Sequence, residues 1–164
     1  MHTASSATAT FLEAKKQLWE VAYAADPPPI VKAGDLVLRQ AACLVPDALL
    51  GSTELLRLVE VMVEVMRAAP GVGLAAPQIG VPLQVLVMED REEYIARLSE
   101  EERVNMERAP FEVVALINPR LLPLGAEGAR FFEGCLSVPG YQGRLYVDRM
   151  LTRSFCSRET LEPK

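Results

Sequence analysis

The segment 53–69 constrains the fold most, because its apolar residues recur at the spacing of one helix face. Ser52 precedes it as a capping residue, and Pro70 and Gly71 end it. The apolar face consists of Leu55, Leu58, Val59, Met62 and Met66. The opposite face carries Arg57, Glu60, Glu64 and Arg67. The pattern therefore predicts an amphipathic helix that packs its apolar face into a core.

Two apolar runs rich in β-branched residues, 83–89 and 112–118, predict buried strands. The stretch between them, 91–108, is densely charged with mixed sign, which indicates a solvated helical excursion. Short extended pieces are expected at 120–124 and 129–132. The expected fold class is α+β, with one core helix packed on short antiparallel strands.

Length and composition favour a single domain. The chain has 164 residues, is 50% hydrophobic and carries a net charge of −5, with no long basic stretch that would favour nucleic acid binding. No apolar run reaches the roughly 18 residues that predict a membrane span. We expect an N-terminal extension at 1–27, partly disordered and with a short helix at 11–24, followed by the domain at 28–164.

Cysteine and histidine usage limits the chemistry. Cys43, Cys135 and Cys156 are widely spaced and odd in number, which is typical of a reducing compartment rather than of a disulfide framework. The single histidine of the sequence is His2. A cysteine hydrolase of the Cys–His type would have only His2 as a base, which argues against that class.

The segment 71–80, GVGLAAPQIG, is the first of two candidate functional segments. Its Gly-x-Gly could indicate a phosphate loop, but no Gly-Lys-Ser/Thr follows and the third glycine is missing. A tight turn between the helix and the next strand is the structural alternative. Neither interpretation explains Gln78, whose side-chain amide could donate a hydrogen bond to a developing oxyanion.

The segment 131–140, FFEGCLSVPG, is the second candidate functional segment. Taken alone, Cys135 is more often a buried, inert thiol than a metal ligand. Its flanking polar residues, Glu133 and Ser137, lie in an otherwise apolar segment. A thiolate at this position could serve a divalent metal ion.

Together, GVGLAAPQIG and EGCLSV resemble two of the three signature motifs of peptide deformylases, over roughly 28–142. The excursion at 91–108 is similar to that of the plant-organelle members. The resemblance implies that the Gln78 amide and the Leu136 N–H are the oxyanion donors and that Cys135 is a thiolate ligand of Fe²⁺ or Zn²⁺. It further implies that three residues line the substrate groove: Val72, Gly73 and Gly134.

The implied family reaction is hydrolytic removal of the N-formyl group from the N-terminal methionine of newly synthesised proteins. A metal-bound hydroxide would attack the formamide carbon. The implied partners are N-formyl-methionyl nascent peptides at the ribosome, with neither nucleic acid nor membrane. The implied location is a mitochondrion or plastid, with a bacterial-type cytosol as the alternative, although 1–10 does not form a complete transit peptide.

The third family motif, HExxH, is missing, because residues 3–164 contain no histidine. The segment 143–150, GRLYVDRM, resembles what family members carry directly after HExxH, so Gln142–Gly143 is interpreted as a junction across an internal deletion. An omitted exon or an error in exon assignment would both produce it. The deletion would remove two metal ligands and the general base.

Three functional outcomes follow from this interpretation. The chain is a deformylase by family, or a catalytically inactive product that at most binds peptide, or a product without a stable function. We expect the chain alone to be inactive and not to retain the metal. We also expect an incomplete core that leaves the apolar faces of 53–69, 83–89 and 112–118 partly exposed.

Overall fold

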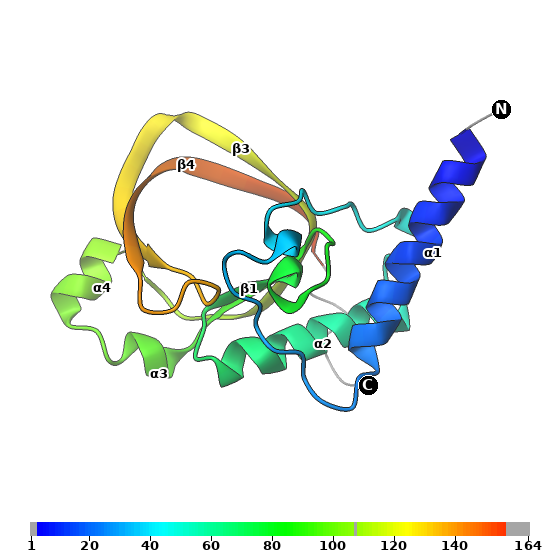
Figure 1. Cartoon of the computed structure of the whole chain (residues 1–164). Coiled ribbons are helices and arrows are strands. Elements are labelled where there is room, and N and C mark those ends of the chain that lie inside the picture. Colours follow the sequence, from blue (N-terminus) through cyan, green and yellow to red (C-terminus); the bar gives the residue numbers. More distant parts are fainter. Residues whose placement is uncertain (1–2, 107, 157–164) are drawn as a thin grey trace.

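The computed structural model describes residues 3–106 and 108–156. It combines helices with a four-stranded antiparallel sheet in the order β1-β2-β3-β4, which confirms the predicted α+β class (Figure 1). The helices are α1 Thr3–Ala22, α2 Thr53–Ala68, α3 Glu92–Ile95 and α4 Glu100–Met106, and the 3-10 helices are η1 Leu36–Leu38, η2 Asp47–Leu49 and η3 Ala76–Ile79. The strands are β1 Gly73–Ala75, β2 Val85–Asp90, β3 Phe111–Gly134 and β4 Gln142–Cys156.

Helix α2 forms as its sequence predicts. The Ser52 side chain accepts a hydrogen bond of 3.2 Å from the Leu55 N–H and so caps the helix. The acidic Glu54 lies in the first turn and the basic Arg67 in the last, as the helix dipole favours. The predicted apolar face is buried: Leu55, Leu58, Val59, Met62 and Met66.

The sheet packs its inner face onto this helix. In β2, Val85 and Val87 are buried, and on β3 the same is true of Ala115 and Ile117. Val85 lies opposite Ile117, and Val87 opposite Ala115, so the strand register aligns the four side chains. The expectation of partial exposure is therefore wrong for the apolar face of α2 and for the inner face of the two strands. It holds for the opposite strand face, where Leu86, Met88, Val114 and Leu116 are only partly buried. Helix α1, which begins at Thr3 and is longer than the predicted 11–24, packs against α2.

The exposed apolar surface lies on the distal part of β3 and β4 instead. The two strands pair from Leu116 opposite Cys156 to Gly134 opposite Gln142, and they arch side by side away from α2 (Figure 1). Gly143 pairs with Glu133, so β4 runs unbroken across the predicted junction. The exposed large side chains of this ribbon are Leu121, Leu122, Leu124, Phe131, Phe132, Leu145, Tyr146 and Val147.

Two buried carboxylates end strand β2, and each is held by an arginine. Glu89 pairs with Arg67 of α2, and Asp90 pairs with Arg108, which precedes β3. The hydrogen-bonded Arg67 guanidinium lowers the pKa of the Glu89 carboxyl below its ordinary value. The excursion between β2 and β3 is helical, as predicted, and the second pair returns it to the sheet.

Among the described residues, no helix combines the length and the apolar character that crossing a membrane requires.

Candidate functional site

The two segments singled out in the sequence lie side by side. The first runs from the end of α2 through β1 and η3, and the second is the loop that joins β3 to β4. A methyl group at Gly71 would come within 2.8 Å of the Leu136 side chain. The two segments thus approach each other closely at Gly71, and a larger residue there would have to displace the end of the Leu136 side chain.

The Gln78 side chain is held in one orientation by partners on both of its ends. Its Oε1 accepts a hydrogen bond of 2.9 Å from the Ala75 N–H. Its Nε2 donates to the Ser137 hydroxyl at 3.2 Å and lies 3.6 Å from the Cys135 Sγ. Because the acceptor end is occupied by a backbone N–H, the donor end of the amide must face Cys135.

A third segment, 30–33, contacts both motifs and is called the strap below. The Val31 N–H donates to the Gln78 carbonyl at 2.9 Å, and the Ala33 N–H donates to the Ser137 carbonyl, also at 2.9 Å. Between them, the Lys32 ammonium donates to the Leu136 carbonyl at 3.2 Å. The strap therefore fixes the backbone of both motifs relative to each other.

This arrangement leaves two hydrogen-bond donors on neighbouring segments, one on the loop between β3 and β4 and one on η3. In the part of the chain that the structure describes, the Leu136 N–H has no backbone acceptor. The Gln78 Nε2 faces the same loop through Cys135 and Ser137. Fixed donors of this kind can stabilise an oxygen that gains negative charge, because they need no reorganisation when the charge forms.

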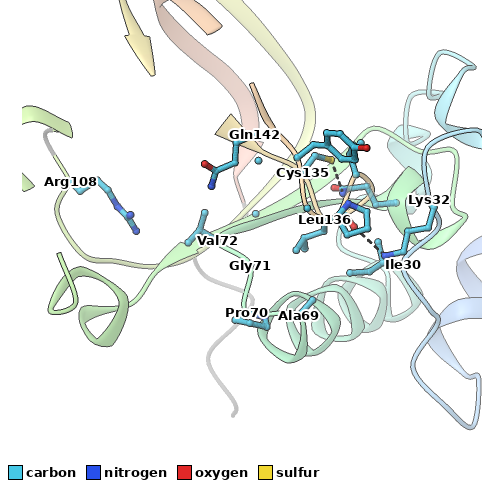
Figure 2. A pocket seen from close by; sticks show the side chains of 17 residues that line it. Ile30, Lys32, Ala69, Pro70, Gly71, Val72, Arg108, Cys135, Leu136 and Gln142 are labelled. Atoms are coloured by element: carbon cyan, nitrogen blue, oxygen red, sulfur yellow. Dashed lines mark hydrogen bonds between the residues drawn. The ribbon is translucent and has the colours of Figure 1, made fainter. Parts of the chain in front are cut away.

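A pocket of about 1090 Å³ opens over the two motifs (Figure 2). All of the predicted site residues line this pocket. The set of predicted residues that line it is Val72, Gly73, Gln78, Gly134, Cys135 and Leu136. The fold thus brings together residues from positions 72 to 136, although the roles expected of them stay predictions.

The donor set for a metal ion is incomplete in this structure. Among the described residues, no three His, Cys, Asp or Glu side chains gather where they could hold a metal. Cys135 is the one described residue of those types on the pocket wall. A catalytic zinc-type site uses about three protein ligands, so the described residues do not fit such a group.

Sequence reasoning did not assign roles to two residues of the site. Ser137 is buried and helps to orient Gln78, and Lys32 holds the loop from the strap. Ser137 stands out as a polar residue in an apolar segment, which is the signal that could have identified it. Nothing local in the sequence indicates Lys32, because its partner lies on a distant segment.

Comparison with known proteins agrees with these features. The family model described as polypeptide deformylase matches residues 27–152. The chloroplastic peptide deformylase 1A of Solanum lycopersicum is 49% identical over 124 residues, which cover 76% of this chain and 44% of that protein. The mitochondrial peptide deformylase of Homo sapiens is 41% identical over 112 residues, which cover 68% of this chain and 46% of that protein.

The solved structures give the same result for the fold. The crystal structure of peptide deformylase from Ehrlichia chaffeensis superposes with a TM-score of 0.64 at 30% identity, covering 79% of this chain and 68% of that one. The chain spans about half of the length of the curated relatives that it matches. Since the family model matches most of the sequence, the chain belongs to the peptide deformylase family.

Proposed function

We propose that the chain serves peptide deformylation, the hydrolytic removal of the N-formyl group from the N-terminal methionine of new proteins. In this proposal the 164 residues supply the part of the site that binds the formyl-methionyl end. The formyl oxygen accepts hydrogen bonds from the Gln78 amide and the Leu136 N–H. The peptide backbone lies along Val72, Gly73 and Gly134.

One observation carries the proposal. The Gln78 amide is oriented by Ala75 so that its Nε2 faces Cys135 and Ser137 at the wall of the pocket. An unconstrained glutamine would lose side-chain entropy on binding, whereas a fixed one has already lost it on folding. The family to which the chain belongs, and the relatives named peptide deformylase, support the same substrate class.

We further propose that a segment is missing between Gln142 and Gly143 and that it carried HExxH. The lone His2 and the incomplete donor set around Cys135 support this proposal. The family's Fe²⁺ or Zn²⁺ would then take Cys135 as one ligand and its other ligands from that segment. We expect a chain without the segment to bind peptide but not to hydrolyse it.

The relatives also indicate a location. Those from Solanum lycopersicum, Arabidopsis thaliana and Homo sapiens are named as chloroplastic or mitochondrial proteins. We propose a plastid or mitochondrion for this chain as well, where N-formyl-methionyl nascent peptides would be its partners. Other relatives come from Streptomyces, which are bacteria, so a bacterial-type cytosol is the alternative location that we propose.

Titration calorimetry with formyl-Met-Ala-Ser tests the binding proposal. Gln78→Ala should weaken binding of the formylated peptide by about fivefold, the value of one hydrogen bond near 1 kcal/mol. It should leave the binding of the same peptide with a free amino terminus unchanged, since that peptide has no formyl oxygen.

Gln84→Ala is the matched control, because Gln84 donates to the Ala42 carbonyl and does not line the pocket. It should change neither affinity. If Gln78→Ala weakens both peptides equally, or neither of them, the assignment of Gln78 to the formyl oxygen is wrong.

A further inference from the structure

The charged side chains on the pocket wall are cationic in the part of the chain that the structure describes. Of the described residues, two charged ones line the pocket, Lys32 and Arg108, and no described Asp or Glu does. The chain as a whole has a net charge of −5, so this pocket differs in sign from the rest of the molecule. A pocket of one sign selects ligands of the opposite sign.

Arg108 is a fixed donor rather than a mobile surface cation. Its Nε and Nη2 donate to the two carboxylate oxygens of Asp90 at 2.8 and 2.7 Å. The Asp90 side chain is only 8% exposed, whereas that of Arg108 is 30% exposed. The hydrogen bond to Asp90 raises the pKa of the guanidinium, so Arg108 stays charged. The bidentate contact leaves the Nη1 hydrogens for another acceptor.

The position of Arg108 suits the far end of a bound peptide. Figure 2 shows Arg108 at one end of the pocket and Cys135 with Lys32 toward the other, with Val72 and Gln142 between them. In the proposed function the formyl group lies at the Cys135 end. A peptide that follows the pocket must then carry its later residues toward Arg108.

We infer that Arg108, held by Asp90, forms a subsite for a carboxylate on the residues that follow formyl-methionine. The carboxylate belongs either to an Asp or Glu side chain or to the C-terminus of a short peptide. This inference rests on the proposed function, because it takes the formyl end of the peptide to lie at Gln78. It also gives the helical excursion between β2 and β3 a function, since that excursion delivers Arg108 to the pocket.

The chemistry favours a carboxylate over a neutral acceptor. A guanidinium presents planar donors that match carboxylate oxygens, and such charge-assisted bonds are about twice as strong as neutral ones. Within 3–106 and 108–156, no acidic side chain lies on the pocket wall to oppose the ligand. Asp90 offsets part of the positive charge, so the expected gain is moderate rather than large.

The test compares peptides that differ by one charge. Calorimetry would use amide-ended formyl-Met tetrapeptides in which one Glu occupies the second, third or fourth position, against the all-Gln equivalents. A Gln peptide with a free C-terminal carboxylate separates the two carboxylate sources. We expect one Glu position, or the free carboxylate, to bind about five- to tenfold more tightly than the neutral peptide at low salt, and high salt to reduce this preference.

Arg108→Met should abolish the preference, so that the Glu and Gln peptides bind equally well. Arg67→Met is the matched control, because Arg67 makes the same bidentate contact with Glu89 one residue away but does not line the pocket. Arg67→Met should keep the preference. If Arg108→Met does not fold, the double variant Asp90→Asn with Arg108→Met leaves no unpaired buried carboxylate and gives the same comparison.

The outcomes are distinct. Two results overturn the inference and leave the proposed function standing. One is equal binding of the Glu, free-acid and neutral peptides, and the other is a preference for the acidic peptide that survives Arg108→Met. Failure of every formylated peptide to bind overturns both. A preference that Arg108→Met removes and Arg67→Met keeps supports the subsite.

Discussion

A chain into which a family segment containing HExxH is inserted between Gln142 and Gly143 is expected to release formate from formyl-Met-Ala-Ser, whereas the unmodified chain is not. Once the histidines are in place, the inserted glutamate should contribute about 10²–10⁴-fold to the rate, the usual contribution of a general acid or base. The two histidines, spaced at i and i+4 on one helix face, supply the ligand types that the described residues lack.

The same insertion with both histidines changed to alanine is the control and should remain at background. In the active chain, Gln78→Ala should lower kcat by about 10²–10³-fold, the usual value of one oxyanion donor. Formate release by the unmodified chain, abolished by Cys135→Ala, would show that the missing histidines are not needed and would contradict the proposed deletion.

The second large effect is expected in the core. Leu58→Ala in α2 should lower the free energy of unfolding by about 2–5 kcal/mol, because the Leu58 side chain is fully buried and its removal leaves a cavity. Natural domains have about 5–15 kcal/mol in total, and the exposed β3–β4 ribbon suggests a value at the low end. In a urea unfolding experiment, the Leu58→Ala chain should therefore already be largely unfolded at low urea concentration.

Leu121→Ala makes the same chemical change on the ribbon, where the side chain is 64% exposed. It should alter the stability by less than about 0.5 kcal/mol, as is usual for surface substitutions. Strong binding of a hydrophobic dye by the unaltered chain, together with a broad thermal transition, would fit the exposed ribbon. A sharp transition with a high midpoint would count against it.

The parts of the fold that could be predicted are those encoded locally. Helix α2 follows from its apolar periodicity, with Ser52 at its start and Pro70 after its end. The strands around 83–89 and 112–118 follow from their β-branched runs. The excursion at 91–108 follows from its mixed charges, although its return to the sheet through Arg108 and Asp90 is a long-range contact that periodicity does not encode.

Strand lengths and exposure could not be predicted in this way. The pieces expected at 120–124 and 129–132 belong to one strand, β3, because pairing with β4 carries the ladder through residues with weak strand propensity, such as Gly128. The missing cover was expected to expose α2 and the central strands. The structure exposes the distal ribbon instead, since α1 and the sheet bury α2 on their own.

In the site, too, some features are encoded locally and others depend on long-range contacts. Two short segments of the sequence predict Gln78, Cys135 and Leu136 as site residues, and the structure brings these segments together at one pocket. What orients them depends on contacts between distant parts of the chain. The strap at Lys32 and the buried Ser137 hydroxyl have no local pattern that would predict their partners.

Titration of the isotopically labelled chain with formyl-Met-Ala-Ser, followed by amide NMR, tests the central claim most directly. The claim is that the Leu136 N–H and the Gln78 Nε2 hydrogens bind the formyl oxygen. We expect the Leu136 amide signal and the Gln78 side-chain amide signals to shift most, to saturate together with the peptide, and not to respond to the peptide with a free amino terminus. Saturable binding that leaves both signals unmoved, or that shifts them equally with both peptides, would contradict it.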